Sequence, residues 1–214
     1  MDGNEARRRM VQSQLEARGI RNRRVLQAMS RVPRERFVLP RDRDRAYDDC
    51  PLSIGHDATI SQPYIVALMT EALDPAPSER VLEVGSGSGY QSAVLVEMGA
   101  TLYTVEIVEQ LSRRAQERMD DLGYRAHFRV GDGREGWPEA APFAGIVVTA
   151  APQEIPPTLV AQLAPGGRMV LPVGSASQEL ILLQDTPSGL KQTSLSAVRF
   201  VPLLENKPHG GTLH

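Results

Sequence analysis

The chain has 214 residues and a mass of 23.4 kDa, with 24 Lys and Arg, 26 Asp and Glu, and one cysteine. A domain of this length buries about 70% of the surface that its unfolded chain exposes, so we expect a single core without disulfide or metal support. One cysteine excludes an internal disulfide, and no Cys/His spacing resembles a zinc site. The longest uncharged stretch, residues 140–153, is too short and too interrupted by proline and glycine to span a bilayer. With no apolar segment after the first basic cluster, we expect no signal peptide and a cytoplasmic location.

The near-neutral total charge conceals an uneven distribution. Residues 1–45 hold 13 Arg and 6 acidic residues, whereas residues 46–214 hold 11 Lys and Arg and 20 acidic residues. A basic segment of this kind is compatible with a nucleic-acid-binding surface. It is also compatible with two solvated helices, broken at Gly19 and closed at Val32-Pro33. We favour the second interpretation because the apolar residues recur at helical spacing. The residues expected to face inward are Met10, Val11, Leu15, Val25, Leu26, Met29 and Val32.

Residues 40–62 follow these helices and show no clear period. A segment of this length inside a compact domain is usually functional or disordered. Its apolar and turn-forming residues favour an ordered, functional loop. From Pro63 the pattern becomes helical, and residues 74–79 form a turn. The expected inward face of this helix comprises Ile65, Leu68, Met69, Ala72 and Leu73.

Short apolar runs then alternate with stretches long enough for helices. The predicted strands are Arg80–Val84, Thr101–Val105, His127–Val130, Ala144–Thr149 and Met169–Pro172. Such alternation predicts a mostly parallel sheet with helices on both faces. Residues 180–185 and 194–204, separated by a turn signal, predict a hairpin added to the sheet. The fold class is therefore α/β, a doubly wound sheet of about seven strands in a single domain, 1–214. We expect a helical extension and loop over 1–78, a core over 79–175 and C-terminal strands with a tail over 176–214.

A glycine-rich turn follows the first of these strands, in the run EVGSGSG at residues 83–89. Glycines at this point let a ligand approach the backbone at the carboxyl end of the strand. A dinucleotide-binding pattern needs Gly or Ala at position 90, where this chain has Tyr90. A phosphate-binding P-loop is excluded because no Gly-Lys pair occurs, and no serine has the flanking glycines of a nucleophile elbow.

Three acidic residues end successive predicted strands. Glu83 precedes the glycine turn, where it suits a cationic ligand group or else caps the next helix. Glu106 ends the second strand, where a carboxylate can accept hydrogen bonds from a ribose diol. Asp132 ends the third, and it can accept from an amino group or serve only as an Asp-Gly turn residue. Since the carboxyl ends of parallel strands share one edge, we expect the three side chains at one site.

Together with residues 105–106, 131–133 and 163–174, this glycine turn resembles the class I S-adenosylmethionine-dependent methyltransferases. Within that class, AYDDCPLSIGHDATISQPYIVALM at residues 46–69 resembles the signature region of the protein-L-isoaspartate O-methyltransferases, and the resemblance spans about residues 5–205. It implies methylation of the free α-carboxyl of L-isoaspartyl residues in damaged proteins and peptides, with repair through a succinimide. The implied cofactor is S-adenosyl-L-methionine, and we expect a monomer without nucleic-acid or membrane partners.

The resemblance also implies residue roles. Ser61 takes the active-site position, and Thr59, Ile60 and Ser61 form the substrate segment. The implied cofactor-binding residues are Glu83, Gly85, Gly87, Gly89, Glu106, Asp132 and Gly133. From its place before a helix, Ser61 can equally be an N-cap. An α-carboxyl has a pKa of about 3.3–3.7 and is already an anion, so the reaction needs no general base. This agrees with a sequence that shows no cluster of catalytic side chains.

The chain departs from the family pattern in a few places. Asp57-Ala58 stands where the motif often has Gly-Gln, an acid is missing near Phe143, and the tail 206–214 does not match. Alternative functions are a related enzyme that tailors one peptide, an RNA-binding methyltransferase that uses the basic segment, and a nicotinamide dehydrogenase.

Overall fold

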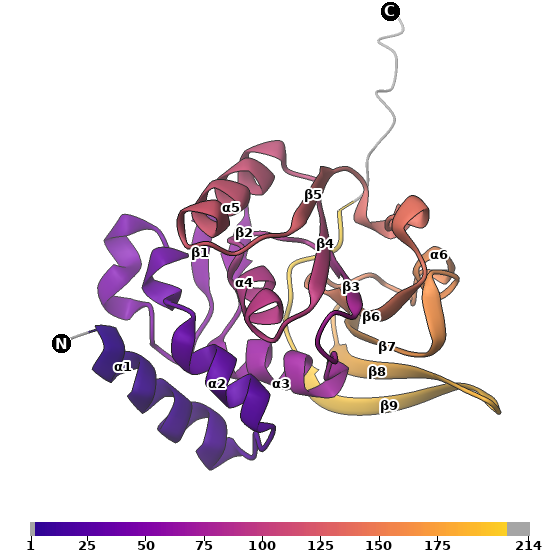
Figure 1. The fold of residues 1–214 in the computed structure, drawn as a ribbon, viewed down its shortest axis with the longest axis horizontal. Coiled ribbons are helices and arrows are strands. Elements are labelled where there is room, and N and C mark those ends of the chain that lie inside the picture. The colour runs from indigo at the N-terminus through magenta and orange to yellow at the C-terminus, as the bar shows by residue number, and fades with distance from the viewer. Residues whose placement is uncertain (1–2, 205–214) are drawn as a thin grey trace, which may run out of the picture.

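The computed structural model describes residues 3–204, and the tail 206–214 therefore lies outside the described residues. A seven-stranded sheet forms its centre (Figure 1), with the strand order β5-β4-β3-β6-β7-β8-β9. Strands β5, β4, β3, β6 and β7 run parallel, and β8 and β9 add an antiparallel hairpin. The strands are β3 Arg80–Val84, β4 Thr101–Glu106, β5 His127–Val130, β6 Phe143–Val148, β7 Leu163–Gly174, β8 Gln178–Thr186 and β9 Gly189–Val198. The predicted doubly wound α/β sheet of about seven strands is confirmed.

The two faces of the sheet are covered unequally. One face packs against helices α3 Pro63–Leu73, α4 Tyr90–Glu97 and α5 Glu109–Asp121. The other packs against the single turn of α6 Pro157–Val160 and the short 3-10 helices Gly133–Glu135 and Pro138–Ala140. Figure 1 shows α1–α5 gathered on one side of the strands and α6 on the other.

The N-terminal segment forms an outer layer on α3 and α4. Helix α1 Gly3–Met10 continues through a π turn at Val11–Leu15 and a 3-10 turn at Glu16–Arg18, and it ends at Gly19 with φ +98°. After this break, α2 Arg23–Arg31 ends before Val32, followed by a 3-10 turn at Arg34–Arg36. The predicted inward apolar residues are buried, except that Leu26 is partly buried. Arg7 and Arg34 depart from the expectation of solvated arginines, because both are buried.

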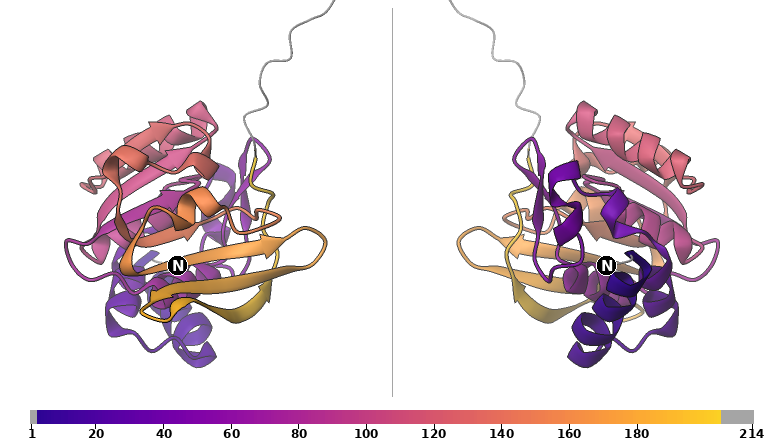
Figure 2. Two further views of the ribbon diagram at one scale, coloured as in Figure 1. Left: turned by 90° about the vertical axis from the view of Figure 1, so that its right-hand side faces the viewer. Right: turned by 90° about the vertical axis from the view of Figure 1, so that its left-hand side faces the viewer.

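The prediction of a loop over residues 40–62 is wrong in part. The segment begins with a 3-10 helix, Pro40–Arg45, and continues into an antiparallel hairpin of β1 Leu52–Gly55 and β2 Ala58–Ile60. In the part of the chain that the structure describes, these strands pair only with each other and form a separate two-stranded sheet. Leu52, Ile54 and Ile60 anchor the hairpin in the core that α2, α3 and α4 share. Figure 2 shows the hairpin beside the last described residues of the chain.

Two other predictions need correction. The buried face of α3 also includes Val66, Ala67 and Thr70, while Ile65, Leu68 and Ala72 are only partly buried. More of the surface of α3 is buried than predicted, because the helix lies between the sheet and the N-terminal layer. The last predicted strand, 194–204, begins earlier and stops at Val198. Beyond it, residues 201–204 leave the sheet edge and run beside Ala151, where two backbone hydrogen bonds hold them.

Further expectations concern cross-links and membranes. Cys50 is a free cysteine. Within residues 3–204 there is no group of His, Cys, Asp and Glu that could hold a metal ion. None of the helices in this part of the chain is long and apolar enough to cross a membrane.

Candidate functional site

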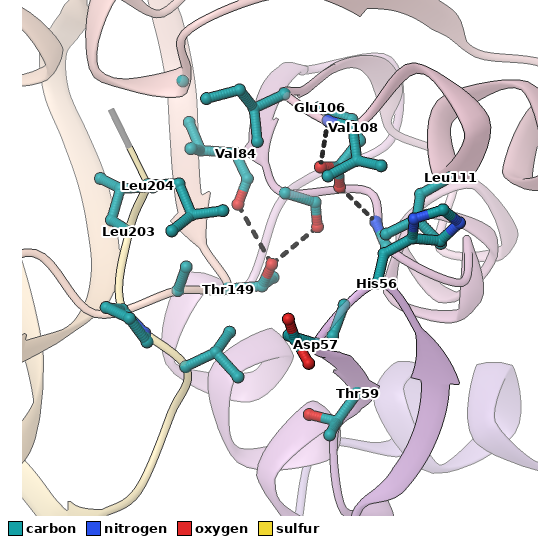
Figure 3. Close-up of a pocket in the computed structure, with 18 of the residues that line it drawn as sticks. His56, Asp57, Thr59, Val84, Glu106, Val108, Leu111, Thr149, Leu203 and Leu204 are labelled. Atoms are coloured by element: carbon teal, nitrogen blue, oxygen red, sulfur yellow. Dashed lines mark hydrogen bonds between the residues drawn. The ribbon is translucent and has the colours of Figure 1, made fainter. Parts of the chain in front are cut away.

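A cavity of about 160 Å³ lies at the carboxyl ends of β3, β4 and β6 (Figure 3). It occupies the point where the order of the parallel strands reverses, which is the usual ligand crevice of an open α/β sheet. Its walls come from three further segments: the tip of the β1–β2 hairpin, the residues after Glu106, and residues 201–204. We call this cavity the cofactor pocket.

The glycine turn forms the floor of the cofactor pocket. Gly85 and Gly87 have φ of +93° and +50° and line the cavity. A Cβ atom on Gly85 would lie 2.5 Å from Thr149 Oγ1, so no larger residue fits there without a shift. The Thr149 hydroxyl donates hydrogen bonds to the carbonyls of Val84 and Gly85, at 3.1 and 2.6 Å. Gly89, by contrast, begins α4 and faces Ala115 of α5.

Glu106 lies in the wall of the pocket, where sequence reasoning expects it. Its side chain accepts backbone hydrogen bonds from Gly87 at 2.9 Å and from Val108 at 3.0 Å. Each carboxylate oxygen thus receives one backbone N–H, and each can accept further bonds. The carboxylate is held in place beside the apolar residues Ile107, Val108 and Leu111. This pairing of an acid with an apolar wall is suited to a ribose that carries a flat base.

Asp132 and Gly133, which follow β5, line different cavities. Gly133 lines the cofactor pocket, and a Cβ atom there would lie 2.3 Å from Val84 Cγ1. The Asp132 side chain turns instead into the neighbouring cavity of about 700 Å³. It accepts from the backbone N–H of Arg134 at 3.0 Å and forms an ion pair with the Arg134 guanidinium at 2.7 Å. Asp132 therefore caps the 3-10 turn, and a direct cofactor contact by its side chain stays a prediction.

Glu83 is fully buried between β3, β4 and α4 and does not line the cofactor pocket. Its Oε2 accepts hydrogen bonds from the hydroxyls of Ser92 and Thr104, and its Oε1 has no partner within residues 3–204. Burial raises the pKa of the Glu83 carboxyl to about 7, against the lowering effect of the two hydroxyls. The Glu83 carboxyl accepts its hydrogen bonds from side-chain hydroxyls rather than from backbone N–H groups of the helix, so Glu83 does not cap α4.

A second cavity, of about 430 Å³, adjoins the cofactor pocket and contains Ser61. We call it the groove. The N-cap interpretation of Ser61 is wrong, because the N-cap residue of α3 is Gln62. The Gln62 side chain makes no capping hydrogen bond. Within residues 3–204, no side-chain hydrogen bond engages the Ser61 hydroxyl. Thr59 and Thr149 line both the groove and the cofactor pocket, so the two cavities meet there. Ile60 points its side chain into the core.

Comparison with known proteins decides the family. Residues 5–208 match the protein-L-isoaspartate(D-aspartate) O-methyltransferase family. The chain belongs to this family. A protein-L-isoaspartate O-methyltransferase of Gloeobacter violaceus is 53% identical over 202 residues, which cover 93% of this chain and 98% of that protein. One from Pelotomaculum thermopropionicum is 52% identical over 208 residues, with coverage of 95% and 91%.

Solved structures of the same family share the fold. One protein-L-isoaspartate O-methyltransferase superposes with a TM-score of 0.83 at 29% identity, covering 94% of this chain and 66% of that longer chain. Another, from Plasmodium falciparum and in complex with S-adenosyl-L-homocysteine, gives a TM-score of 0.80 at 26% identity, with coverage of 94% and 99%. The N-terminal layer and the hairpin are thus included in the resemblance along with the sheet.

The cofactor pocket fits the family's cofactor, S-adenosyl-L-methionine. Gly85, Gly87 and Gly133 line the pocket without side chains of their own, and Glu106 lines it with oxygens that can still accept hydrogen bonds. When bound, the cofactor supplies a methyl group on a positively charged sulfur atom. Gly85, Gly87, Glu106 and Gly133 are the predicted cofactor residues that line the pocket.

Sequence reasoning missed several residues of the methyltransferase site. Thr149 ends the fourth predicted strand, and the argument that selected the acids at other strand ends could have selected it too. Ile107 and Val108 directly follow Glu106, so their place at the pocket could also have been predicted from the sequence. The placement of Leu203 beside the pocket depends on contacts across the whole chain, for which the sequence carries no local signal.

Proposed function

We propose that this protein transfers the methyl group of S-adenosyl-L-methionine to the free α-carboxyl of L-isoaspartyl residues in damaged proteins and peptides. The ester then closes to a succinimide, which can reopen to a normal aspartyl linkage. One observation carries the proposal: the groove that contains Ser61 meets the cofactor pocket at Thr59 and Thr149. A carboxylate held in the groove can therefore reach the cofactor without a long tunnel.

The residues of the site act by binding and orienting. The substrate carboxyl has a pKa of about 3.3–3.7 and is an anion near neutral pH, so no residue has to remove a proton. Ser61 can donate a hydrogen bond to this carboxylate and fix its direction, without acting as a nucleophile. Apolar groove residues such as Ile65 and Phe200, together with Val201, lie beside it. Alignment of this kind can lower a barrier by about 7–11 kcal/mol at best.

The proposal includes the chain's wider properties. We assign residues 1–214 to one methyltransferase domain that acts as a cytoplasmic monomer on isoaspartyl-containing proteins and peptides, without a nucleic-acid partner. Ion pairs support the proposal that no nucleic acid binds. Four arginines of the basic segment each pair with an acidic side chain of the same chain: Arg7, Arg18, Arg24 and Arg31. Such charges are already compensated.

A pair of peptides that differ only in isoaspartate against aspartate tests the activity. With isotope-labelled cofactor, we expect base-labile label on the isoaspartyl peptide alone. Equal labelling of both peptides, or of neither, would reject the proposal.

The role of Ser61 is tested in the same assay. Ser61→Ala removes one hydrogen bond to a charged group, so we expect kcat/KM to fall about ten- to a hundredfold. Cofactor binding by calorimetry should not change. Ser53→Ala on the neighbouring strand β1 is the matched control, since Ser53 pairs with Thr59 in register but lines neither cavity. Equal losses in the two variants would remove Ser61 from the mechanism.

A further inference from the structure

The tip of the β1–β2 hairpin has an unusual backbone. His56 and Asp57 form the two-residue turn between the paired residues Gly55 and Ala58, and their φ angles are +54° and +55°. Turns with two positive φ angles strongly favour Asn-Gly, because non-glycine residues are uncommon in that region even though Asn, Asp and His are enriched among them. Neither turn residue here is glycine. Strained non-glycine residues persist mainly where the side chain has a function.

Both side chains of this turn line the cofactor pocket. Figure 3 shows His56 beside Val108 and Leu111, while the Asp57 carboxylate points toward the space between Thr59 and Thr149. Within residues 3–204, no hydrogen bond or ion pair holds this carboxylate. Asp57 does not line the groove that contains Ser61. Its charge therefore acts on the cofactor side of the junction.

The other acids near the site do not supply this charge. Glu106 lies across the pocket and is held by the backbone of Gly87 and Val108. Glu83 is buried outside the pocket, and Asp132 is paired with Arg134. Asp57 is thus the acid of the pocket wall nearest to the Thr59–Thr149 junction (Figure 3).

The junction is where a methyl group must pass, if the proposed function holds. The sulfur that carries this methyl group is a cation before transfer and a neutral thioether afterwards. A carboxylate beside it attracts the methyl donor but not the demethylated product. We propose that Asp57 is a specificity-determining residue that makes the pocket prefer S-adenosyl-L-methionine over S-adenosyl-L-homocysteine. This inference rests on the proposed function and adds discrimination between donor and product to it.

Calorimetric binding of both ligands to the full chain tests the inference. Asp57→Asn keeps the shape and tolerates a positive φ but removes the charge. Because Asp57 is exposed, we expect the dissociation constant of S-adenosyl-L-methionine to rise about three- to tenfold, with little change for S-adenosyl-L-homocysteine. Asp57→Gly should give the same loss of preference. The control is Asp44→Asn, which removes an equal charge from the exposed 3-10 helix Pro40–Arg45.

Each other outcome has a definite meaning. Equal weakening of both ligands in Asp57→Asn would show a wall contact without charge discrimination and would overturn the inference, as would unchanged binding of both. A loss in Asp57→Gly alone would assign the effect to the backbone and would also overturn it. If the unmodified protein binds neither ligand, the proposed function fails and the inference falls with it.

Discussion

Glu83 and Glu106 are two carboxylic acids on neighbouring strands, yet their surroundings give them different chemistry. Glu106 receives two backbone N–H groups at the wall of the cofactor pocket. Among the described residues, Glu83 receives two hydroxyl groups on one oxygen, and its other oxygen has no partner. The cost of burying a charge there raises the pKa of Glu83 to about 7. Both are buried carboxylic acids near the ends of their strands, so the hydrogen-bond donors and the access to the pocket are what distinguish them.

This raised pKa predicts a pH-dependent stability. Below the ordinary value of 4.5, Glu83 is protonated in both the folded and the unfolded chain. Between pH 4.5 and about 7 only the folded chain keeps the proton. The free energy of unfolding therefore decreases as pH rises, by up to about 1.4 kcal/mol per pH unit. We expect Glu83→Gln to remove this slope, measured by urea unfolding at several pH values.

The control for this measurement is Glu117→Gln on the exposed side of α5, which should leave the slope unchanged. An identical pH dependence in the unmodified protein and in Glu83→Gln would place the Glu83 pKa near its ordinary value and contradict the expectation.

Among the elements, the β1–β2 hairpin is where local sequence preference and observed structure disagree most. Its strands have four and three residues and pair with no other strand among residues 3–204. The prediction of a loop rests on the lack of a clear period over residues 40–62, and the turn also lacks the glycine that normally marks a hairpin in a sequence. The hairpin forms because its apolar residues are anchored in the core beneath it.

The strained turn predicts a stabilising substitution. Replacing His56-Asp57 by Asn-Gly gives the pair that a turn with two positive φ angles favours, and we expect the free energy of unfolding to rise by about 1 kcal/mol. The urea midpoint at constant m-value measures this change. A lower midpoint would mean that the two side chains contribute more through contacts than their backbone costs.

The other elements show where sequence patterns suffice. The bounds of β3 and β5 agree with the prediction, and in each case a glycine, Gly85 or Gly131, directly follows the last residue of the strand. Strand β7 was predicted only over Met169–Pro172, because Pro165, Gly166 and Gly167 interrupt its apolar pattern. These three residues lie in an irregularity of the pairing with β6, between the pairs Phe143–Leu163 and Gly145–Arg168, and the ladder to β8 begins only at Arg168. The sequence likewise located the glycine turn and Glu106, whereas residues 201–204 reach the site only through tertiary contacts.

At the scale of the whole molecule, the basic N-terminal segment lies away from the cofactor pocket. Arg24 donates hydrogen bonds to the carbonyls of Pro75 and Met98, which precede β3 and β4 and mark the amino ends of the strands. The pocket is at the carboxyl ends. Arg21, Arg23 and Arg24, at the start of α2 or just before it, are therefore badly placed to attract an anionic substrate to the site.

Substituting Glu for Arg21, Arg23 and Arg24 tests whether these charges affect substrate binding. We expect the KM for the isoaspartyl peptide to stay within about twofold at physiological salt, because exposed charges are screened beyond about 8 Å. Some loss of stability is expected, since Arg24 pairs with Asp74. A large rise in KM that disappears at high salt would instead show that the segment steers substrate.

The two hydrogen bonds from Thr149 to Val84 and Gly85 join the strands on either side of the point where the sheet reverses its order. The floor of the pocket is thereby part of the sheet and cannot vary without disturbing the core. Its rim, in contrast, consists of a hairpin tip and the segment 201–204, neither of which belongs to the seven-stranded sheet. Evolution can thus alter how tightly donor and product are held by exchanging rim residues such as Asp57, while the scaffold that positions them stays the same.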